Sequence, residues 1–299
     1  MTPALAAGFL LVDKAAGWTS HDVVAKVRNL LGIKKVGHAG TLDPMATGLL
    51  VLGLGRTTRL LRFVQEAEKE YVARAQFGVA TDSLDADGAV LSRDPMEIEE
   101  SDVEAALERF RGSIMQVPPM VSARKVEGRR LYELAREGQE VERESRPVTV
   151  YELELIDFAP SDYPQVDFRV RCSKGTYVRT LADDLARALG GRAHLTELRR
   201  TRNGGLSVAD SYTVESIASA AADDDWRGLV LEPLDGLPDL PLVEVDAEIA
   251  QAVANGVPLA GSILAGAESG FVRLADPARR LLGVYRVEGS RAVPEVVIS

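Results

Sequence analysis

Two hydrophobic patterns predict the strands of this chain. Continuous apolar runs over residues 8–12 and 49–54 have the length of buried strands. Apolar and polar residues alternate over residues 71–79 and 165–172, and residues 146–158 are also strand-like. Such a two-residue period is typical of a sheet with one covered face.

Helical spacing of apolar residues marks the segments between these strands. Val23 and Val27 share one face of a predicted helix that begins at the N-cap Ser20 and ends at Gly32. Further helices are predicted within residues 57–70, from about Ser101, after the proline-stiffened loop that opens residues 116–143, and after residue 173, with Ser173 or Thr176 as the cap.

The chain changes character near residue 236. A proline-rich link is followed by a short helix and by short strands around residues 271–275, 281–287 and 295–299. We therefore predict two domains, residues 1–235 and residues 236–299, of which the second is a small all-β unit. The first domain mixes helices and strands, which predicts an α/β class.

Charge is distributed unevenly along the chain. The formal net charge of −10 argues against a protein that coats nucleic acid through an overall positive field. Residues 14–75, however, hold ten Lys and Arg against five Asp and Glu, and residues 168–205 hold nine against three. Residues 82–108 hold one against ten. We expect two basic surfaces that contact a phosphate backbone, while ordinary solvated faces of mixed charge stay open as the alternative.

Several kinds of site are excluded by what the sequence lacks. Cys172 is the only cysteine, so an intrachain disulfide and a cysteine-rich zinc site are impossible, and the three histidines have no metal-ligand spacing. Phosphate-loop, dinucleotide and nucleophile-elbow motifs are missing. The apolar opening lacks the preceding positive charge of a signal peptide, and no apolar run approaches the roughly 20 residues that span a bilayer. We expect a protein of the reducing cytoplasm without a metal or cofactor.

The acidic segment after residue 80 imitates a calcium loop. Ser83, Asp85, Asp87, Gly88 and Asp94 fall close to the ligand positions of such a loop. The first position is nevertheless Ser, the last is Asp, and the preceding element reads as a strand. The preferred interpretation is an acidic hairpin loop.

The stretch VGHAGTLDPMATGLLVLGLG places one carboxylate, Asp43, between a glycine-rich loop and a buried strand. An Asp before a Pro commonly starts a turn, and this stays the simplest interpretation of the residue in isolation. Gly37, Gly40 and Gly48, however, allow a ligand to approach the backbone closely, and the strand gives the carboxylate a rigid base. A reactive carboxylate must be ionised and partly desolvated, and Arg179, near the start of a helix, is the candidate that holds its pKa down.

Four other residues have two interpretations each. His38 either stacks on a base or positions a phosphate, or it is an ordinary loop histidine. Tyr71 either lies flat on a nucleobase or is half-buried core with its hydroxyl outward. Arg179 taken alone is an exposed helix arginine, and Cys172 is best explained by packing. Spacing along the sequence does not choose between these interpretations.

The loop GHAGTLDPMATGLL closely resembles the signature of the TruB family of tRNA pseudouridine synthases, whose invariant aspartate corresponds to Asp43. Further blocks occur in the family's order across residues 9–205: LLVDKAAGWTSHDVV, KEYVARAQFGVATDSLDADG, QVPPMVSARKVEGRRLYELAREG, RPVTVYELEL and CSKGTYVRTLADDLARALGGRAHLTELRRT. So many blocks in one order argue against coincidence.

The resemblance implies a fold and a reaction. The fold is a mixed, largely antiparallel curved sheet flanked by helices, followed by a small PUA-like β domain. The reaction is isomerisation of uridine 55 in the T-arm of tRNA, without metal, cofactor or external energy source. The target base must leave its stack, so an aromatic platform compensates by roughly 1–3 kcal/mol. The expected partner is the T-arm stem-loop, bound by a monomer without guide RNA or membrane.

Site residues are carried over position by position. Asp43 is implied to be the nucleophile or the sugar-activating carboxylate, Tyr71 to stack on the target base, and Arg179 to pair with Asp43. The implied substrate-binding residues are His38, which helps to displace the flipped nucleotide, Lys174 and Leu198, which lie in pocket-lining blocks, and Lys14. The chain departs from the family's usual residues at Ala15, Ser83, Val121 and Leu206.

Three other functions stay open at this point. The first is a tRNA-binding folding chaperone whose chemistry is incidental. The second is a guide-RNA-dependent relative of the archaeal and eukaryotic branch, against which the short segment after residue 236 argues. The third is a glycoside hydrolase, which normally needs a second carboxylate; the nearest candidates are Asp82 and Asp85.

Overall fold

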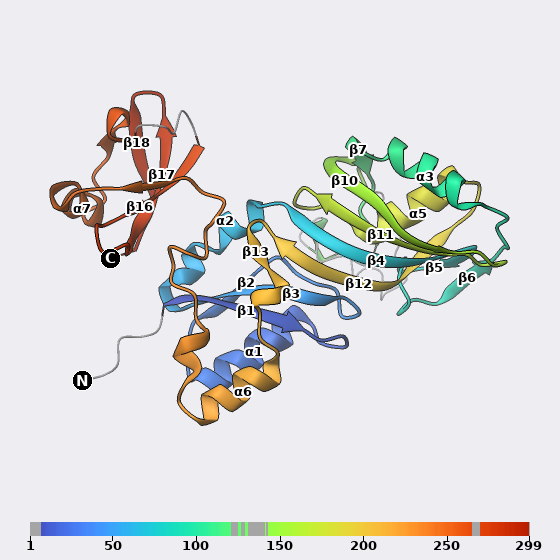
Figure 1. The fold of residues 1–299 in the computed structure, drawn as a ribbon, viewed down its shortest axis with the longest axis horizontal. Coiled ribbons are helices and arrows are strands. Elements are labelled where there is room, and N and C mark those ends of the chain that lie inside the picture. Colours follow the sequence, from blue (N-terminus) through green and yellow to red (C-terminus); the bar gives the residue numbers. More distant parts are fainter. Residues whose placement is uncertain are drawn as a thin grey trace.

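The computed structural model describes residues 7–120, 125–126, 129–130, 141, 143–264 and 270–298. Two sheets dominate this part of the chain, a nine-stranded sheet in the larger unit and a five-stranded sheet near the C-terminus (Figure 1). No helix among the described residues is long and apolar enough to cross a membrane.

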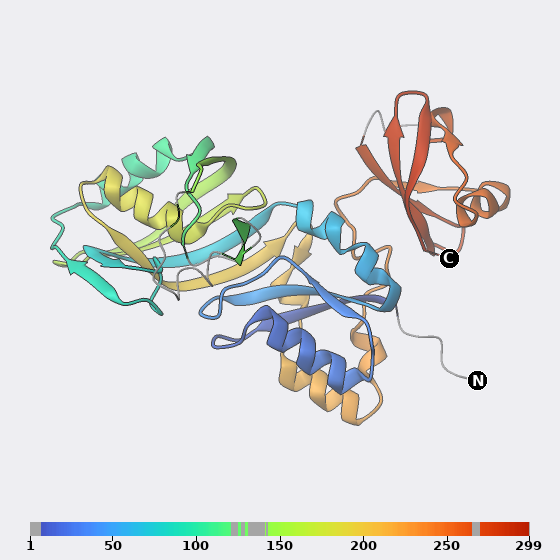
Figure 2. The same cartoon turned by 180° about the vertical axis from the view of Figure 1, so that it is seen from behind.

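The main sheet is mixed but largely antiparallel, as predicted, and it curves across the larger unit (Figure 2). Its order is β1-β3-β12-β4-β11-β10-β7, with β2 paired to β3 and β13 to β12. Only β3 and β12 run parallel among these pairs. The strands are β1 (Gly8–Lys14), β2 (Val36–Ala39), β3 (Thr47–Leu54), β4 (Lys69–Phe77), β7 (Gly112–Gln116), β10 (Arg146–Ala159), β11 (Gln165–Cys172), β12 (Ala193–Asn203) and β13 (Leu206–Ser207).

The central strand β12 and the short strand β2 do not follow from the sequence patterns. β12 lacks a clean alternation because its register shifts between Leu195 and Glu197 and again between Arg200 and Arg202. Each shift moves the following residues to the other face, so the two-residue period is lost. β2 was expected to be loop, and it places His38 on a strand instead.

Helices α1 (Ser20–Leu31), α2 (Leu61–Glu66), α3 (Glu100–Arg109) and α5 (Val178–Ala188) lie where predicted, whereas α6 (Val214–Ala222) was not predicted. The 3₁₀ helices of the larger unit are η1 (Gly55–Arg59), η2 (Val208–Asp210) and η3 (Trp226–Leu229). Thr19, not Ser20, is the N-cap of α1, because its side chain accepts a hydrogen bond from the backbone N–H of Asp22. Gly32 ends α1 in the left-handed conformation, as expected.

Helix α3 begins near Ser101, as predicted, with Glu99 as its N-cap. The predicted cap of α5 is wrong. Tyr177 is the N-cap of α5. Ser173 and Thr176 instead form the turn before α5, where the Thr176 hydroxyl donates to the Ser173 carbonyl oxygen. The turn delivers Arg179 into the first turn of α5, where the sequence placed it.

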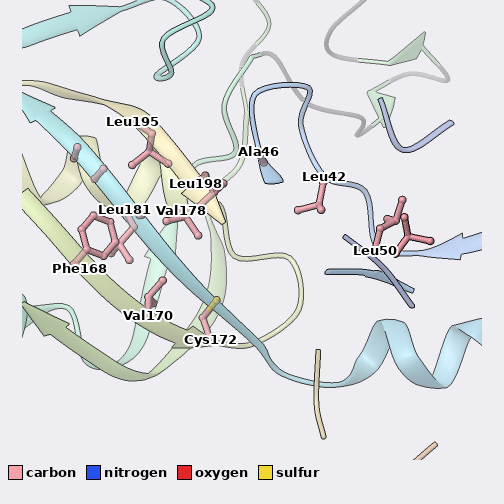
Figure 3. Close-up of a cluster of buried hydrophobic side chains, with 14 of the residues drawn as sticks. Leu42, Ala46, Leu50, Phe168, Val170, Cys172, Val178, Leu181, Leu195 and Leu198 are labelled. Carbon is pink, nitrogen blue, oxygen red and sulfur yellow. The ribbon is translucent and has the colours of Figure 1, made fainter. Parts of the chain in front are cut away.

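The main core lies between one face of the sheet and its helices. α5 packs on β12, and α3 packs on β10 and α5. Phe168 and Val170 of β11 lie close to Leu181 of α5 and Leu195 of β12 in this layer (Figure 3). The strands in the middle of the sheet therefore have one packed face, which explains their two-residue period.

Most basic side chains of residues 168–205, where a basic surface was expected, are paired with acidic side chains. Seven of its nine Lys and Arg form ion pairs: Arg169, Arg171, Lys174, Arg179, Arg187, Arg192 and Arg199. Several of their partners are acidic residues far away in the sequence, such as Asp13 and Glu68. A charge count over one segment misses such cross-strand partners, because neighbouring strands come from distant parts of the chain.

The acidic hairpin is confirmed, whereas the cationic helix lies mostly outside the described residues. β5 (Val79–Thr81) and β6 (Val90–Arg93) pair antiparallel around the acidic loop. Within the stretch where the cationic helix was expected, the structure describes the short strands β8 (Lys125–Val126) and β9 (Arg129–Arg130). The departure at Val121 also lies outside the described residues.

The C-terminal unit has a helix and short strands, as predicted. It comprises β14 (Leu242–Glu244), α7 (Ala247–Ala254), β15 (Leu259–Ala260), the 3₁₀ helix η4 (Gly261–Leu264), β16 (Gly270–Ala275), β17 (Leu281–Glu288) and β18 (Arg291–Val297), with the sheet order β14-β16-β17-β18-β15. It contacts the larger unit through α2, where Arg62 pairs with Glu295 at 2.7 Å and Phe63 packs edge-on against Phe271. The domain boundary at residue 236 and the PUA-like character stay predictions.

A half-buried carboxylate on α5 gives a test of the packing. Burial and the neighbouring Asp183 carboxylate raise the pKa of Asp184 to about 6. The folded state therefore binds more protons than the unfolded state between the ordinary carboxyl pKa and 6, and stability falls as pH rises through this window. We expect Asp184→Asn to raise the free energy of unfolding at pH 7.5 by about 1 kcal/mol, after allowance for partial exposure.

Urea unfolding at pH 7.5 and pH 4 measures this effect, which should vanish at the lower pH. Asp183→Asn is the matched control and should destabilise the protein, because Asp183 accepts hydrogen bonds from Arg187 and Arg192. An Asp184→Asn protein no more stable than the parent at pH 7.5 would contradict the assignment.

Candidate active site

A cavity of about 290 Å³ lies where the Asp43 loop, β4, β12 and the start of α5 meet. Five of the seven predicted site residues line it: Asp43, Tyr71, Lys174, Arg179 and Leu198. His38 and Lys14 are not among the lining residues. Residues separated by more than 150 positions in the sequence thus share one cavity.

Asp43 and Arg179 form the ion pair expected from the resemblance. Asp43 Oδ2 lies 3.0 Å from Arg179 Nη2, and the Asp43 side chain is 35% exposed while that of Arg179 is 3% exposed. Arg179 Nη1 lies 2.9 Å from Asp85 Oδ2 and donates to the Ser83 carbonyl oxygen at 2.7 Å. A single guanidinium therefore serves two carboxylates.

The pKa of Asp43 moves in the direction opposite to the expected one. Arg179 does lower it, but burial in the cavity raises the pKa of Asp43 by more, and the charge of Asp85 raises it further. The physical reason is that Arg179 is shared, so its charge offsets only part of the desolvation of Asp43. Asp43 is consequently a more basic carboxylate than an exposed aspartate.

Apolar residues of the Asp43 loop anchor it to the main core. Leu42 and Ala46 are buried in the main core, on either side of Asp43 in the sequence (Figure 3). The Ser20 hydroxyl accepts a hydrogen bond from the Leu42 backbone N–H at 2.9 Å. These contacts anchor the loop, whose residues Gly40, Thr41, Leu42 and Asp43 line the cavity.

Lys14 holds the same loop from the end of β1. It is completely buried, and its Nζ donates to the carbonyl oxygens of Ala15, Trp18 and Pro44 at 2.7–3.2 Å. Burial lowers the pKa of Lys14 to about 8. With its three donors used, Lys14 supports the turn after Asp43, and its proposed contact with substrate stays a prediction.

Tyr71 presents an aromatic ring at the cavity wall. It lies on β4 between β11 and β12, opposite Val170 and Arg200. Burial raises the pKa of its hydroxyl, and the charge of Arg200 acts against this rise. The ring belongs to a strand paired on both sides, so it forms a rigid platform on which a planar base can stack.

His38 lies on β2, near the loop rather than within the cavity lining. Its ring packs edge-on against His21 with ring centres 5.3 Å apart. Its Nδ1 atom is buried without a hydrogen-bond partner among the described residues. Burial lowers the pKa of His38, which favours the neutral imidazole.

Lys174 and Leu198 lie on two sides of the cavity. The Lys174 side chain is 57% exposed and pairs with Glu66 at the end of α2. Leu198 is buried on β12 and joins the main core to the cavity wall. Leu198 therefore gives the cavity an apolar surface, while Lys174 gives its rim a positive charge.

Three residues of the site were not assigned their role from the sequence. Asp85 was considered only as a calcium ligand or second hydrolase carboxylate, yet it is the buried partner of Arg179. Lys69 donates to the carbonyl oxygens of Gln65 and Ala67, and burial lowers its pKa to about 8. Arg200 lines the cavity from β12.

Sequence signals for these residues are weak. Arg200 lies two positions after Leu198 on a strand, which is the only spacing that indicates a shared face. Asp85 and Arg179 are separated by 94 positions, and nothing local connects them. Among the described residues, no group of three or more His, Cys, Asp or Glu is placed to hold a metal ion.

Two models of one protein family match consecutive parts of this chain. The model of the TruB family pseudouridylate synthase N-terminal domain matches residues 28–178, and the model of the tRNA pseudouridylate synthase B C-terminal domain matches residues 179–237. The chain belongs to the TruB family. The predicted family is therefore confirmed, and the matched residues include the whole Asp43 loop, β4 and α5.

Full-length relatives agree with the family models. The chain is 46% identical over 296 residues to tRNA pseudouridine synthase B of Burkholderia pseudomallei (strain 668), which covers 97% of this chain and 96% of the relative. It is 45% identical over 287 residues to the protein of the same name from Moorella thermoacetica, with 94% of each covered.

Solved structures show the same fold. A chain of a Cbf5-Nop10-Gar1 complex superposes with a TM-score of 0.78 and 26% identity, covering 98% of this chain and 84% of that one. A chain of an H/ACA RNP bound to a substrate RNA containing 2'-deoxyuridine gives a TM-score of 0.75 and 25% identity, covering 98% and 85%. The predicted fold class of the TruB-family chain is confirmed.

The shared guanidinium predicts how Asp43 responds when its competitor is removed. In Asp85→Asn, the like charge is lost and Arg179 interacts more strongly with Asp43, so the pKa of Asp43 should fall. Carboxyl-carbon NMR titration of the protein measures it. Asp82→Asn in the same loop is the control, because Asp82 accepts the Ala89 backbone N–H rather than contacting Arg179. An unchanged pKa in Asp85→Asn would contradict the coupling.

Proposed function

We propose that this protein isomerises a uridine of tRNA to pseudouridine, and that the target is uridine 55 of the T-arm. The observation that carries the proposal is the Asp43–Arg179 ion pair beside Tyr71 in one cavity, in a chain of the TruB family. Relatives named tRNA pseudouridine synthase B, which match nearly the whole chain, support tRNA as the substrate.

The reaction rearranges bonds without changing the atom count. The glycosidic bond between N1 of uracil and C1′ of ribose breaks, and a bond between C5 and C1′ forms. C5 loses its proton, and N1 ends with a proton. Because product and substrate are isomers, the protein must supply an ionised carboxylate, a held base and proton transfer, but no co-substrate.

Asp43 and Tyr71 divide this work. The Asp43 carboxylate acts on the extruded nucleotide by attack at the sugar carbon, attack at the base ring or removal of a proton, and each of these routes needs its ionised form. Tyr71 stacks on the freed uracil, so the base stays in the cavity while it turns. Arg179 keeps Asp43 directed at the nucleotide and stabilises its charge.

The remaining predicted residues fit substrate binding. We assign His38 to the displacement of the flipped nucleotide and Lys174 to a phosphate at the cavity rim, because each lies beside the Asp43 loop or the opening. Leu198 packs against the base edge. Lys14 contributes through the turn that it holds after Asp43.

A glycoside hydrolase is not favoured by the geometry. A second catalytic carboxylate would have to reach the sugar, but Asp85 is 4% exposed and both of its oxygens are engaged by Ser83, Asp87 or Arg179. A tRNA-folding binder without required catalysis is not favoured either, because the relatives that match nearly the whole chain are named as synthases.

The form in which the protein acts is also proposed. We infer a cytoplasmic monomer that works without guide RNA, since the relatives at 45–46% identity are bacterial proteins named for tRNA and match along nearly their whole length. The archaeal-type complexes with Nop10 and Gar1 share the fold at lower identity. Conversion of an isolated T-arm stem-loop without added RNA or protein distinguishes the two modes.

Replacing the carboxylate tests the function directly. Asp43→Asn keeps the shape but removes the charge, so single-turnover conversion of uridine in a T-arm stem-loop should fall by at least about 10⁴-fold. Affinity for the stem-loop, measured by fluorescence anisotropy, should stay within about threefold, because Asp43 contributes to chemistry rather than to phosphate contacts.

The unmodified protein and Asp82→Asn serve as controls in that assay. Lack of conversion by the unmodified protein at stoichiometric enzyme would reject the proposed reaction. Conversion by Asp43→Asn at the parental rate would show that Asp43 is not the carboxylate on which the reaction depends.

The raised pKa of Asp43 predicts the acidic limit of activity. Activity needs the ionised carboxylate and is lost as pH falls through the pKa of Asp43. Because this pKa lies above the ordinary aspartate value, the loss of kcat/KM should set in at a higher pH than about 4. A pH–rate profile on the stem-loop measures it, with circular dichroism at each pH to show that the fold persists. A profile flat down to pH 4 would contradict the raised pKa.

A further inference from the structure

Arg200 is a buried arginine that pairs with no acidic side chain in the part of the chain that the structure describes. It is 1% exposed on β12, and no carboxylate of the described residues forms an ion pair with it. A buried guanidinium is costly to desolvate unless good acceptors satisfy it. Its two hydrogen bonds are therefore the reason why it is tolerated in the core.

Both hydrogen bonds go to backbone carbonyls that bracket Asp43. Arg200 Nε donates to the Leu49 carbonyl oxygen at 2.7 Å, and Nη2 donates to the Gly40 carbonyl oxygen at 3.1 Å. Gly40 precedes the loop and Leu49 follows it on β3. The planar guanidinium thus links the two ends of the loop. Its N–H groups point in fixed, divergent directions, which suits two separated acceptors.

The backbone at the C-terminal end of the Asp43 loop packs closely against the backbone of Arg200. Gly48 pairs with Arg200 across the parallel strands β3 and β12 and has φ of +95°. A Cβ atom at Gly48 would lie 2.3 Å from the Arg200 carbonyl oxygen, so no side chain fits there. The close approach explains why a glycine is needed at this position.

The same arginine lies beside the aromatic platform. Arg200 is paired with Tyr71 across β12 and β4, and both line the cavity. Its charge also acts on the Tyr71 hydroxyl. Arg200 therefore contacts the two ends of the Asp43 loop and neighbours the ring on which the base is proposed to stack.

We propose that Arg200 is a positioning residue that fixes the Asp43 carboxylate relative to the Tyr71 ring. This inference rests on the proposed function, since it concerns the chemistry of the same cavity. Arg200 acts through the loop and through Tyr71, and it leaves tRNA affinity to other residues because its side chain is buried. Its loss lets the carboxylate shift relative to the base.

The variants Arg200→Lys and Arg200→Met test this role. Lysine keeps the charge but has no fork that reaches both carbonyls, and methionine fills the volume without donors. We expect kcat to fall by about 10²-fold in both, the effect of a misplacement of roughly 1 Å, while KM and stem-loop affinity stay within about threefold. Arg202→Met is the matched control, because Arg202 lies exposed on the same strand and should convert uridine at the parental rate.

Chemical rescue separates positioning from a loss of fold. Arg200→Ala leaves space for methylguanidinium. Added methylguanidinium should raise the single-turnover rate of Arg200→Ala by at least about tenfold, an effect that a misfolded chain cannot show. Thermal unfolding of each variant is measured in parallel. If Arg200→Met unfolds, Arg200→Lys and the rescue of Arg200→Ala decide the question.

Two results would overturn the proposal. One is a folded Arg200→Lys or Arg200→Met protein with the parental kcat. The other is a loss of kcat that accompanies an equal loss of stem-loop affinity without methylguanidinium rescue, which would make Arg200 a merely structural residue. Inactivity of the unmodified protein in the same assay would instead reject the proposed reaction and is thus distinguishable.

Discussion

The site depends on one guanidinium placed between two carboxylates. Arg179 is buried at the start of α5, and it contacts Asp43 from the β2–β3 loop and Asp85 from the β5–β6 hairpin. With a single acidic partner, Arg179 would hold Asp43 ionised but also weaken it as a base and nucleophile. Burial raises the pKa of Asp43 most, and with two acidic partners the guanidinium offsets only part of this rise, so Asp43 keeps a raised pKa and greater basicity. Three distant segments must therefore assemble before the carboxylate has its chemistry.

Two buried cations fix the loop that carries Asp43. Lys14 donates to the carbonyl oxygens of Trp18, before α1, and of Pro44, within the loop. Arg200 donates to carbonyl oxygens at the two ends of the loop. Neither cation forms an ion pair with an acidic side chain of the described residues, so backbone carbonyl dipoles offset the free-energy cost of their desolvation. Lys14 also lowers the pKa of Asp43 and so partly opposes the effect of burial. The groups that hold the loop thus also stabilise the charge on it.

The sequence was sufficient for most elements and for the Asp43–Arg179 ion pair, but for different reasons. Periodicity located β4, β11 and α1 because each of them has one packed face. The pairing of Asp43 with Arg179 came from the family resemblance, since no local pattern relates residues so far apart. Residue chemistry alone gave the wrong direction for the pKa of Asp43, because it underestimated the burial of Asp43 in the cavity and did not include the charge of Asp85. β12 was missed because its register shifts hide the alternation.

The location of unpaired surface charge could not be predicted from sequence segments either, because residues distant in the sequence are neighbours in the fold. Segment counts treat neighbours in sequence as neighbours in space, yet Arg171 of β11 pairs with Glu68 and Glu152 from other strands or loops. The excess of acid in residues 82–108 belongs to the hairpin and α3, at the end of the main sheet far from the C-terminal unit (Figure 1). The cavity itself is lined by more cationic than acidic side chains, with Lys69, Lys174, Arg179 and Arg200 around Asp43. Net charge therefore says little about an anionic substrate, whose approach is governed by the local field at the opening.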